Sequence, residues 1–203
     1  METTSHMLMG RLLLAYVQKQ YGMTLDSRNF LLGNVLPDYL PSFLSRPHFL
    51  KYGTDHVRRL IQRLSGRLPA PGAPNGRLAR YSRRLGMLCH FYTDFFCYAH
   101  CAHFPPGLKR HIGYERELTL FFQEHYEALL AQPLVARTRR TPDIEARFNR
   151  LQSAYLASEH TYLNDIAYAF YACVDVIAAV CRCGIAGEAG VRVRGKEAGV
   201  ASL

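Results

Sequence analysis

The sequence predicts an all-α protein, folded as a helical bundle. Apolar residues recur at the three- and four-residue spacing of amphipathic helices over most of the chain. No segment reads as a convincing strand, and no glycine-rich phosphate loop or internal repeat is present. A length of 203 residues with 49% hydrophobic and 20% charged residues is typical of one globular domain. We expect this domain to span residues 1–184, and the glycine-rich, basic residues 185–203 to form a disordered tail.

The first half of the chain contains two predicted helices and two irregular stretches. Thr4 or Ser5 can cap a first helix that runs to Tyr21 and ends at Gly22. An irregular loop region with several prolines follows. Thr54 can cap a second helix, whose core face carries Val57, Leu60, Ile61 and Leu64. Residues 68–76, with three prolines and two glycines, are expected to be a linker within the domain.

The second half contains four more predicted helices. The third runs over residues 78–102 and stops before Pro105, and the fourth covers residues 108–130. Thr141 is expected to cap the fifth, with Pro142 at its first position. The last helix is expected over residues 162–183, ending at Gly184.

Charge and cysteine usage restrict the partners and the compartment. The formal net charge of +9 suits an anionic partner such as a phosphate ester, a nucleic acid or a membrane surface. Six scattered cysteines without a CxxC pair indicate free thiols in a reducing compartment. Arg11 interrupts the apolar residues 7–17, which therefore do not resemble a signal peptide, and no apolar run approaches the roughly 20 residues that span a bilayer. We expect a soluble, cytoplasmic protein.

Metal-ligand side chains gather on the third and fourth predicted helices. His90, Asp94 and His100 fall within one arc of about 120° on a helix, with about 15 Å along the axis between the two histidines. On a straight helix they would therefore serve two or three neighbouring ions. His111 and Glu115, four residues apart, share one face of the next helix.

This mixture of donors predicts a zinc site. Three imidazoles and two carboxylates suit zinc, and several ions with open positions suit hydrolysis. The aromatic residues Phe91, Phe95 and Phe96 surround them, and charged groups rarely enter apolar surroundings unless paired or metal-bound. One histidine on an apolar helix is usually a core residue, but five ligand-type residues at this spacing favour metal binding.

The motif His90-x3-Asp94-x5-His100, followed by His111-x3-Glu115, resembles the signature of zinc-dependent phospholipases C. The related single-strand-specific zinc nucleases use a comparable cluster. Three upstream pieces are similar as well: His6 in the first helix, residues 33–38 with Asp38, and residues 47–49 with His48. The resemblance covers residues 5–120 and implies an all-α bundle with a multinuclear cleft that holds two to three zinc ions.

The resemblance also implies a role for each matching residue. It assigns His48, His90 and Asp94 to a first zinc, His100, His111 and Glu115 to a second, and His6 with a bridging Asp94 to a third. Asp38 would act as the general base or orient the attacking water, and Tyr39 would contact the substrate headgroup. In the secreted enzymes an N-terminal tryptophan completes the third site. This chain has no tryptophan, so whether Met1 reaches that site stays open.

The implied reaction is phosphodiester hydrolysis, in which a metal-activated water attacks phosphorus. A phospholipid would give diacylglycerol and a phosphorylated headgroup, and such a substrate would bring the protein to a membrane surface. Single-stranded nucleic acid or a small phosphodiester would fit the same chemistry. A catalytically silent metal-binding protein is a third reading, which the missing tryptophan favours and the presence of Asp38 opposes. No protein partner is implied.

Overall fold

The computed structural model describes residues 1–40, 50–70, 72–73, 76–131 and 143–181, with side chains from residue 55 onward in the second of these ranges. In these ranges the chain forms seven α-helices, two short 3-10 helices and no strand, which confirms the predicted all-α fold. In order they are α1 (Thr3–Tyr21), α2 (Ser27–Val35), η1 (Leu36–Asp38), α4 (Leu50–Leu64), α5 (Arg77–Phe95), η2 (Tyr98–His100), α6 (Leu108–Ala131), α7 (Ile144–Leu156) and α8 (Tyr162–Cys181).

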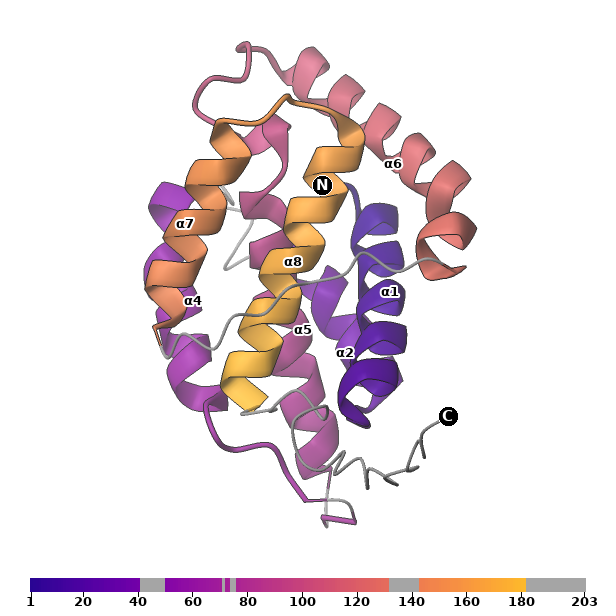
Figure 1. Cartoon of the computed structure of the whole chain (residues 1–203), viewed down its shortest axis with the longest axis vertical. Helices are drawn as coiled ribbons and strands as arrows, with labels where there is room; N and C mark the ends of the chain where they lie inside the picture. Colours follow the sequence, from indigo (N-terminus) through magenta and orange to yellow (C-terminus); the bar gives the residue numbers. More distant parts are fainter. Residues whose placement is uncertain (41–49, 71, 74–75, 132–142, 182–203) are drawn as a thin grey trace, which may run out of the picture.

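Helix α8 lies at the centre of the bundle. It contacts α1, α4, α5, α6 and α7, and in Figure 1 the α4–α7 side and the α1–α6 side flank it. By length and composition its 20 residues could cross a membrane, with a mean hydropathy of 1.5. The expectation that no apolar run reaches this length was therefore wrong. However, 67% of that apolar window is buried inside the fold, so most of these side chains pack against other helices.

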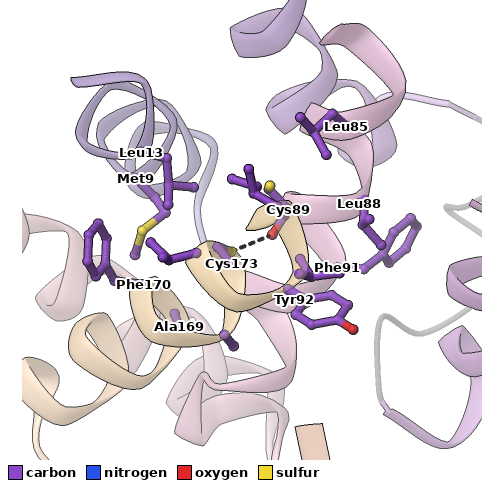
Figure 2. Packing of buried hydrophobic residues seen from close by; sticks show 14 of the residues in the cluster. Met9, Leu13, Leu85, Leu88, Cys89, Phe91, Tyr92, Ala169, Phe170 and Cys173 are labelled. Atoms are coloured by element: carbon purple, nitrogen blue, oxygen red, sulfur yellow. Dashed lines mark hydrogen bonds between the residues drawn. The ribbon is translucent and has the colours of Figure 1, made fainter. Parts of the chain in front are cut away.

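Helices α1, α5 and α8 meet in one hydrophobic core. Figure 2 shows side chains from all three in contact, including Met9 and Leu13 of α1, Leu88 and Cys89 of α5, and Phe170 and Cys173 of α8. The Cys173 thiol donates a hydrogen bond to the carbonyl oxygen of Cys89 at 3.5 Å. Close packing of large side chains on both faces of α5 fixes the position of this helix along its axis and its rotation about that axis. His90 and Asp94, which α5 carries, are thereby held in place.

Two glycines let α2 lie directly on α5. A Cβ atom on Gly33 would stand 2.1 Å from the carbonyl oxygen of Arg83, and one on Gly86 would stand 2.1 Å from that of Phe30. Neither position can accept a side chain unless the helices separate. This close approach carries η1, which follows α2, and thereby Asp38, to the level of His90.

The N-terminal boundaries differ from the predictions in three places. Helix α1 begins at Thr3, and Gly22 ends it in the left-handed conformation with φ of 60°, as expected. Helix α2 was missed: the Asp26 side chain caps it by accepting from the amide of Asn29 at 2.9 Å. Helix α4 begins at Leu50, so the predicted start at Thr54 was wrong.

The third predicted helix is too long by seven residues. Helix α5 ends at Phe95 and η2 follows, because the Tyr98 amide donates to the Asp165 carboxylate at 2.9 Å and not to a helical carbonyl. Helix α6 matches its prediction to within one residue. Helix α7 has Asp143 as its N-cap; the predicted cap at Thr141 and the predicted end of α8 at Gly184 lie outside the described residues.

Candidate metal centre

The last turns of α5 meet α1 in a buried group of three ligand-type side chains. One donor atom from each of His6, His90 and Asp94 lies within 4.8 Å of the other two. Nε2 of His6 is 3.2 Å from Oδ1 of Asp94, and Nε2 of His90 is 3.3 Å from Oδ2. The two imidazole rings stack with their centroids 3.9 Å apart. All three residues are almost wholly inaccessible to solvent.

A backbone carbonyl fixes the tautomer of His90. Its Nδ1 lies 2.8 Å from the carbonyl oxygen of Asn34, which can only accept, so Nδ1 carries the proton. The lone pair is then on Nε2, which faces Asp94 and Asp38. A metal-binding histidine usually has its second ring nitrogen held in this way.

A second group lies where η2 meets α6. Donor atoms of Cys97, His100 and Glu115 lie within 4.8 Å of one another. Glu115 Oε1 is 2.8 Å from Nε2 of His100 and 3.2 Å from Nε2 of His111. Because the chain turns after Phe95, Nδ1 of His100 comes back to 3.6 Å from Oδ1 of Asp94. The separation of about 15 Å expected for a straight helix was therefore wrong, and the two groups adjoin.

The α-amino group of Met1 lies between the two groups. Its nitrogen is 2.6 Å from Oδ1 of Asp94, 3.0 Å from Oε1 of Glu115 and 3.5 Å from Nε2 of His100. Met1 therefore reaches the cluster, which answers the question that the sequence left open. The buried ammonium also marks a place where these side chains accommodate a positive charge.

The electrostatics of the cluster favour the metal-binding forms of its side chains. Burial, reinforced by the neighbouring His90, lowers the pKa of His6 to about 3. Burial would raise the pKa of Asp94, but the Met1 ammonium and the histidines around it hold that pKa well below its usual value. Burial would likewise raise the pKa of Glu115, and hydrogen bonds from His100 and His111 lower it instead. Neutral His6 and ionised carboxylates are the protonation states in which such side chains bind metals.

The donor set fits zinc. Nε2 of the buried His6 faces Asp94 but makes no hydrogen bond among the described residues, which leaves it available to a metal ion. Imidazole nitrogens and carboxylate oxygens are common zinc ligands, and carboxylates offset the charge of a dication. His48, which the resemblance assigns to the first zinc, lies outside the described residues.

Asp38 and Tyr39 stand at the solvent side of the first group. Oδ1 of Asp38 is 3.5 Å from Nε2 of His90, and its side chain is 24% exposed. The Thr3 hydroxyl lies 3.5 Å from Oδ2 of Asp38 and 3.2 Å from the Tyr39 hydroxyl. Tyr39 is 64% exposed, so its ring is accessible to a ligand that approaches Asp38.

A buried carboxylate outside the ligand groups anchors the turn that carries His100. Asp165 of α8 accepts from the Tyr98 amide at 2.9 Å, the Tyr114 hydroxyl at 2.9 Å and the Tyr155 hydroxyl at 2.7 Å. Burial raises the pKa of Asp165 to about 6, while these three donors partly oppose that rise. The network ties η2 to α6, α7 and α8.

Sequence reasoning missed two contributors to this centre, the Asn34 carbonyl and Asp165; it left the reach of Met1 open and took Cys97 for a core residue. Cys97 has a sequence signal, because it lies between Asp94 and His100 inside the ligand motif. The Asn34 carbonyl and Asp165 act through contacts between segments far apart in the chain, and no local pattern reports them.

Comparison with known protein families identifies a match over most of the chain. The model of the family described as zinc dependent phospholipase C matches residues 5–162, which is more than half of the 203 residues. No curated protein and no solved structure matches the chain.

Proposed function

The chain belongs to the zinc-dependent phospholipase C family, and from that membership we propose that it is a zinc-dependent hydrolase that cleaves phosphodiesters with two to three bound zinc ions. The five cysteines in the described part of the chain are free thiols, which suits the cytoplasm as its location.

The ligands divide over three positions in this proposal. His90 and Asp94, with His48, would hold a first ion; His100, His111 and Glu115 a second; and His6, Asp94 and the Met1 amine a third. Zinc, when bound, polarises phosphoryl oxygens and lowers the pKa of a coordinated water from about 15.7 to about 7. The protein contributes the placement of these ligands and of the groups that handle protons beside them.

The observation that carries the proposal is the carboxylate of Asp38 beside His90. A purely structural metal site has no use for a further, partly exposed carboxylate at 3.5 Å from a ligand nitrogen. In a hydrolase this carboxylate can accept a proton from a water or hold that water in line with phosphorus. The hydroxyl of Thr3, 3.5 Å away, orients Oδ2 so that Oδ1 faces the cluster.

Tyr39 is the proposed contact for the rest of the substrate. Its exposed ring lies beside Asp38 and Thr3, and its hydroxyl is tethered to Thr3. An aromatic face attracts a cationic headgroup, which favours a phospholipid substrate and contact with a membrane surface. The net charge of +9 keeps single-stranded nucleic acid as the second candidate substrate, because an aromatic ring also stacks on bases.

The test is a turnover assay on zinc-loaded protein. Phospholipid vesicles, a chromogenic phosphodiester and single-stranded DNA are supplied in parallel, and the products are identified. Release of diacylglycerol at a rate that depends on zinc supports the phospholipase reading, whereas cleavage of DNA alone supports the nuclease reading. Zinc binding without turnover on any of the three would reject the hydrolase proposal.

A further inference from the structure

Cys97 presents a buried thiol to the second ligand group. It occupies the single extended residue between α5 and η2, and it has no exposed surface. Its Sγ, a ring nitrogen of His100 and a carboxylate oxygen of Glu115 all lie within 4.8 Å of one another. The family signature assigns His100 and Glu115 to a zinc ion and assigns no cysteine.

The other thiols differ from Cys97 in their surroundings. Cys101 donates to the carbonyl of Cys97 at 3.7 Å and Cys173 to the carbonyl of Cys89 at 3.5 Å, as core thiols commonly do. Among the described residues, Cys97 has no such acceptor, and a ring nitrogen of His100 and a carboxylate oxygen of Glu115 lie within 4.8 Å of its sulfur. Potential metal ligands at this distance distinguish Cys97 from a thiol that only fills space in the core.

The spacing is that of ligands around one ion. Zinc binds sulfur at about 2.3 Å, and imidazole nitrogen or carboxylate oxygen at about 2.0–2.2 Å. At the tetrahedral angle, two ligand atoms of one zinc ion are therefore about 3.3–3.7 Å apart. Three atoms that lie within 4.8 Å of one another reach that arrangement through side-chain shifts of up to about 1 Å toward a shared ion.

We propose that Cys97 is a thiolate ligand of the second metal site, together with His100, His111 and Glu115. Binding breaks the S–H bond, forms the metal–sulfur bond and releases the proton to solvent. This inference rests on the proposed function, because it requires that the second group binds a metal.

With Cys97 as a ligand, the first and the second ligand group would have different roles. Four protein ligands close a tetrahedral site, which is the pattern of structural zinc, whereas catalytic sites keep an open position. The second ion then holds η2 against α6. Substrate and water bind on the side of His90 and Asp38.

Cobalt(II) is the probe that tests this ligand. The protein is stripped with a chelator and titrated with cobalt, which gives visible d–d bands at any tetrahedral site and a near-ultraviolet charge-transfer band only when thiolate is bound. We expect the charge-transfer band in the unaltered protein, its loss in Cys97→Ser, and its retention in Cys101→Ser. Cys101 is the matched control, because its thiol lies one turn away and donates to a backbone carbonyl.

The outcomes separate this inference from the proposed function. Visible bands without a charge-transfer band, or a band that persists in Cys97→Ser, would overturn the thiolate ligand and leave the metal centre standing. Absence of any bound cobalt or zinc would overturn the centre itself. If Cys97→Ser does not fold, X-ray absorption of the unaltered zinc protein decides: a sulfur neighbour at about 2.3 Å supports the proposal, and a shell of nitrogen and oxygen alone rejects it.

Discussion

Oδ1 of Asp38 lies 3.5 Å from Nε2 of His90, although the two residues come from different helices. The contact exists because α2 lies against α5 and delivers η1 to the rim of the ligand cluster. It places a partly exposed carboxylate next to a ring nitrogen of the candidate metal centre, although Asp38 belongs to neither ligand-type group.

Asp38→Asn should keep its zinc and lose turnover. Asparagine is nearly isosteric with aspartate but cannot take up a proton, and general-base catalysis typically contributes about 10²–10⁴-fold. We expect phosphodiester hydrolysis to fall by that factor at unchanged zinc content and melting temperature. The matched control is Asp143→Asn, at the N-cap of α7, where asparagine caps equally well. Loss of zinc from Asp38→Asn would make Asp38 a ligand instead.

His90→Ala should lose metal and stability together. The ring joins the Asn34 carbonyl to the cluster, and its removal takes away a ligand and leaves that buried carbonyl without its partner. Elemental analysis should show a loss of about one zinc per chain, and the melting temperature should fall because bound metal no longer stabilises the fold. The exposed His103 is the control, and His103→Ala should change neither quantity. Full zinc content in His90→Ala would refute its place in the centre.

Residues added before Met1 should weaken the centre. A preceding Gly-Gly dipeptide converts the Met1 amine into an amide, which cannot be charged and has no lone pair to offer a metal. The contacts to Asp94 and Glu115, at 2.6 and 3.0 Å, would then be lost. We expect about one zinc fewer per chain, as measured by elemental analysis against the same dipeptide added after Leu203. Equal metal content in both proteins would exclude the amine as a ligand.

His6 should make the metal-free protein less stable from about pH 6.5 downward, and the raised pKa of Asp165 should offset part of this loss below about pH 6. Folding lowers the pKa of His6 from 6.5 to about 3, so unfolding takes up a proton between these values and stability falls as the pH drops. The slope from this one group is about 1.4 kcal/mol per pH unit. The depressed pKa values of Asp94 and Glu115 add a loss of the same sign below about pH 4.5.

Urea unfolding of the chelated protein between pH 4.5 and 7 measures this slope. His6→Gln should reduce it by about one proton. His103→Gln, at an exposed position, should leave it unchanged. A slope that is the same in His6→Gln and the unaltered protein would contradict the assignment to His6.

Gly86→Ala should separate α2 from α5. The new Cβ would lie 2.1 Å from the Phe30 carbonyl oxygen, and relief of such overpacking typically costs about 1–3 kcal/mol. Turnover should also fall, because Asp38 moves with α2. Gly113→Ala in α6 is the control: nothing lies within 4 Å of its Cβ, and alanine favours a helix by up to about 1 kcal/mol. Urea midpoints and rates that are equal for the two variants would rule out this role for the glycine contact.

Local patterns predicted the parts of the site that local geometry builds. The four-residue spacings of His90 with Asp94 and of His111 with Glu115 place each pair on one helix face, and the structure retains both pairs. The turn after Phe95 contains no glycine or proline, the residues from which a turn is usually predicted. The carboxylate of Asp165 on α8 stabilises this turn by accepting a hydrogen bond from the Tyr98 amide. A contact between segments so far apart in the chain produces no periodic pattern from which it could be predicted.

Helix α2 escaped prediction for a related reason. Nine residues with a glycine near the end are weak evidence for a helix, and Gly33 is typical of a helix end until its contact with α5 is known. The position of Asp38 beside His90 therefore could not be derived from spacing, and only the resemblance pointed to it.

Asp165 has a consequence for how the molecule opens. Its carboxylate receives one donor each from η2, α6 and α7 while it belongs to α8, so none of these elements can detach without exposing a buried anion that has lost a partner. These four segments therefore form one cooperative unit, and local fraying next to His100 is suppressed. The amide hydrogen of Tyr98 then exchanges with solvent only when that whole unit opens, at a rate that reports on the end of the bundle and not on one turn.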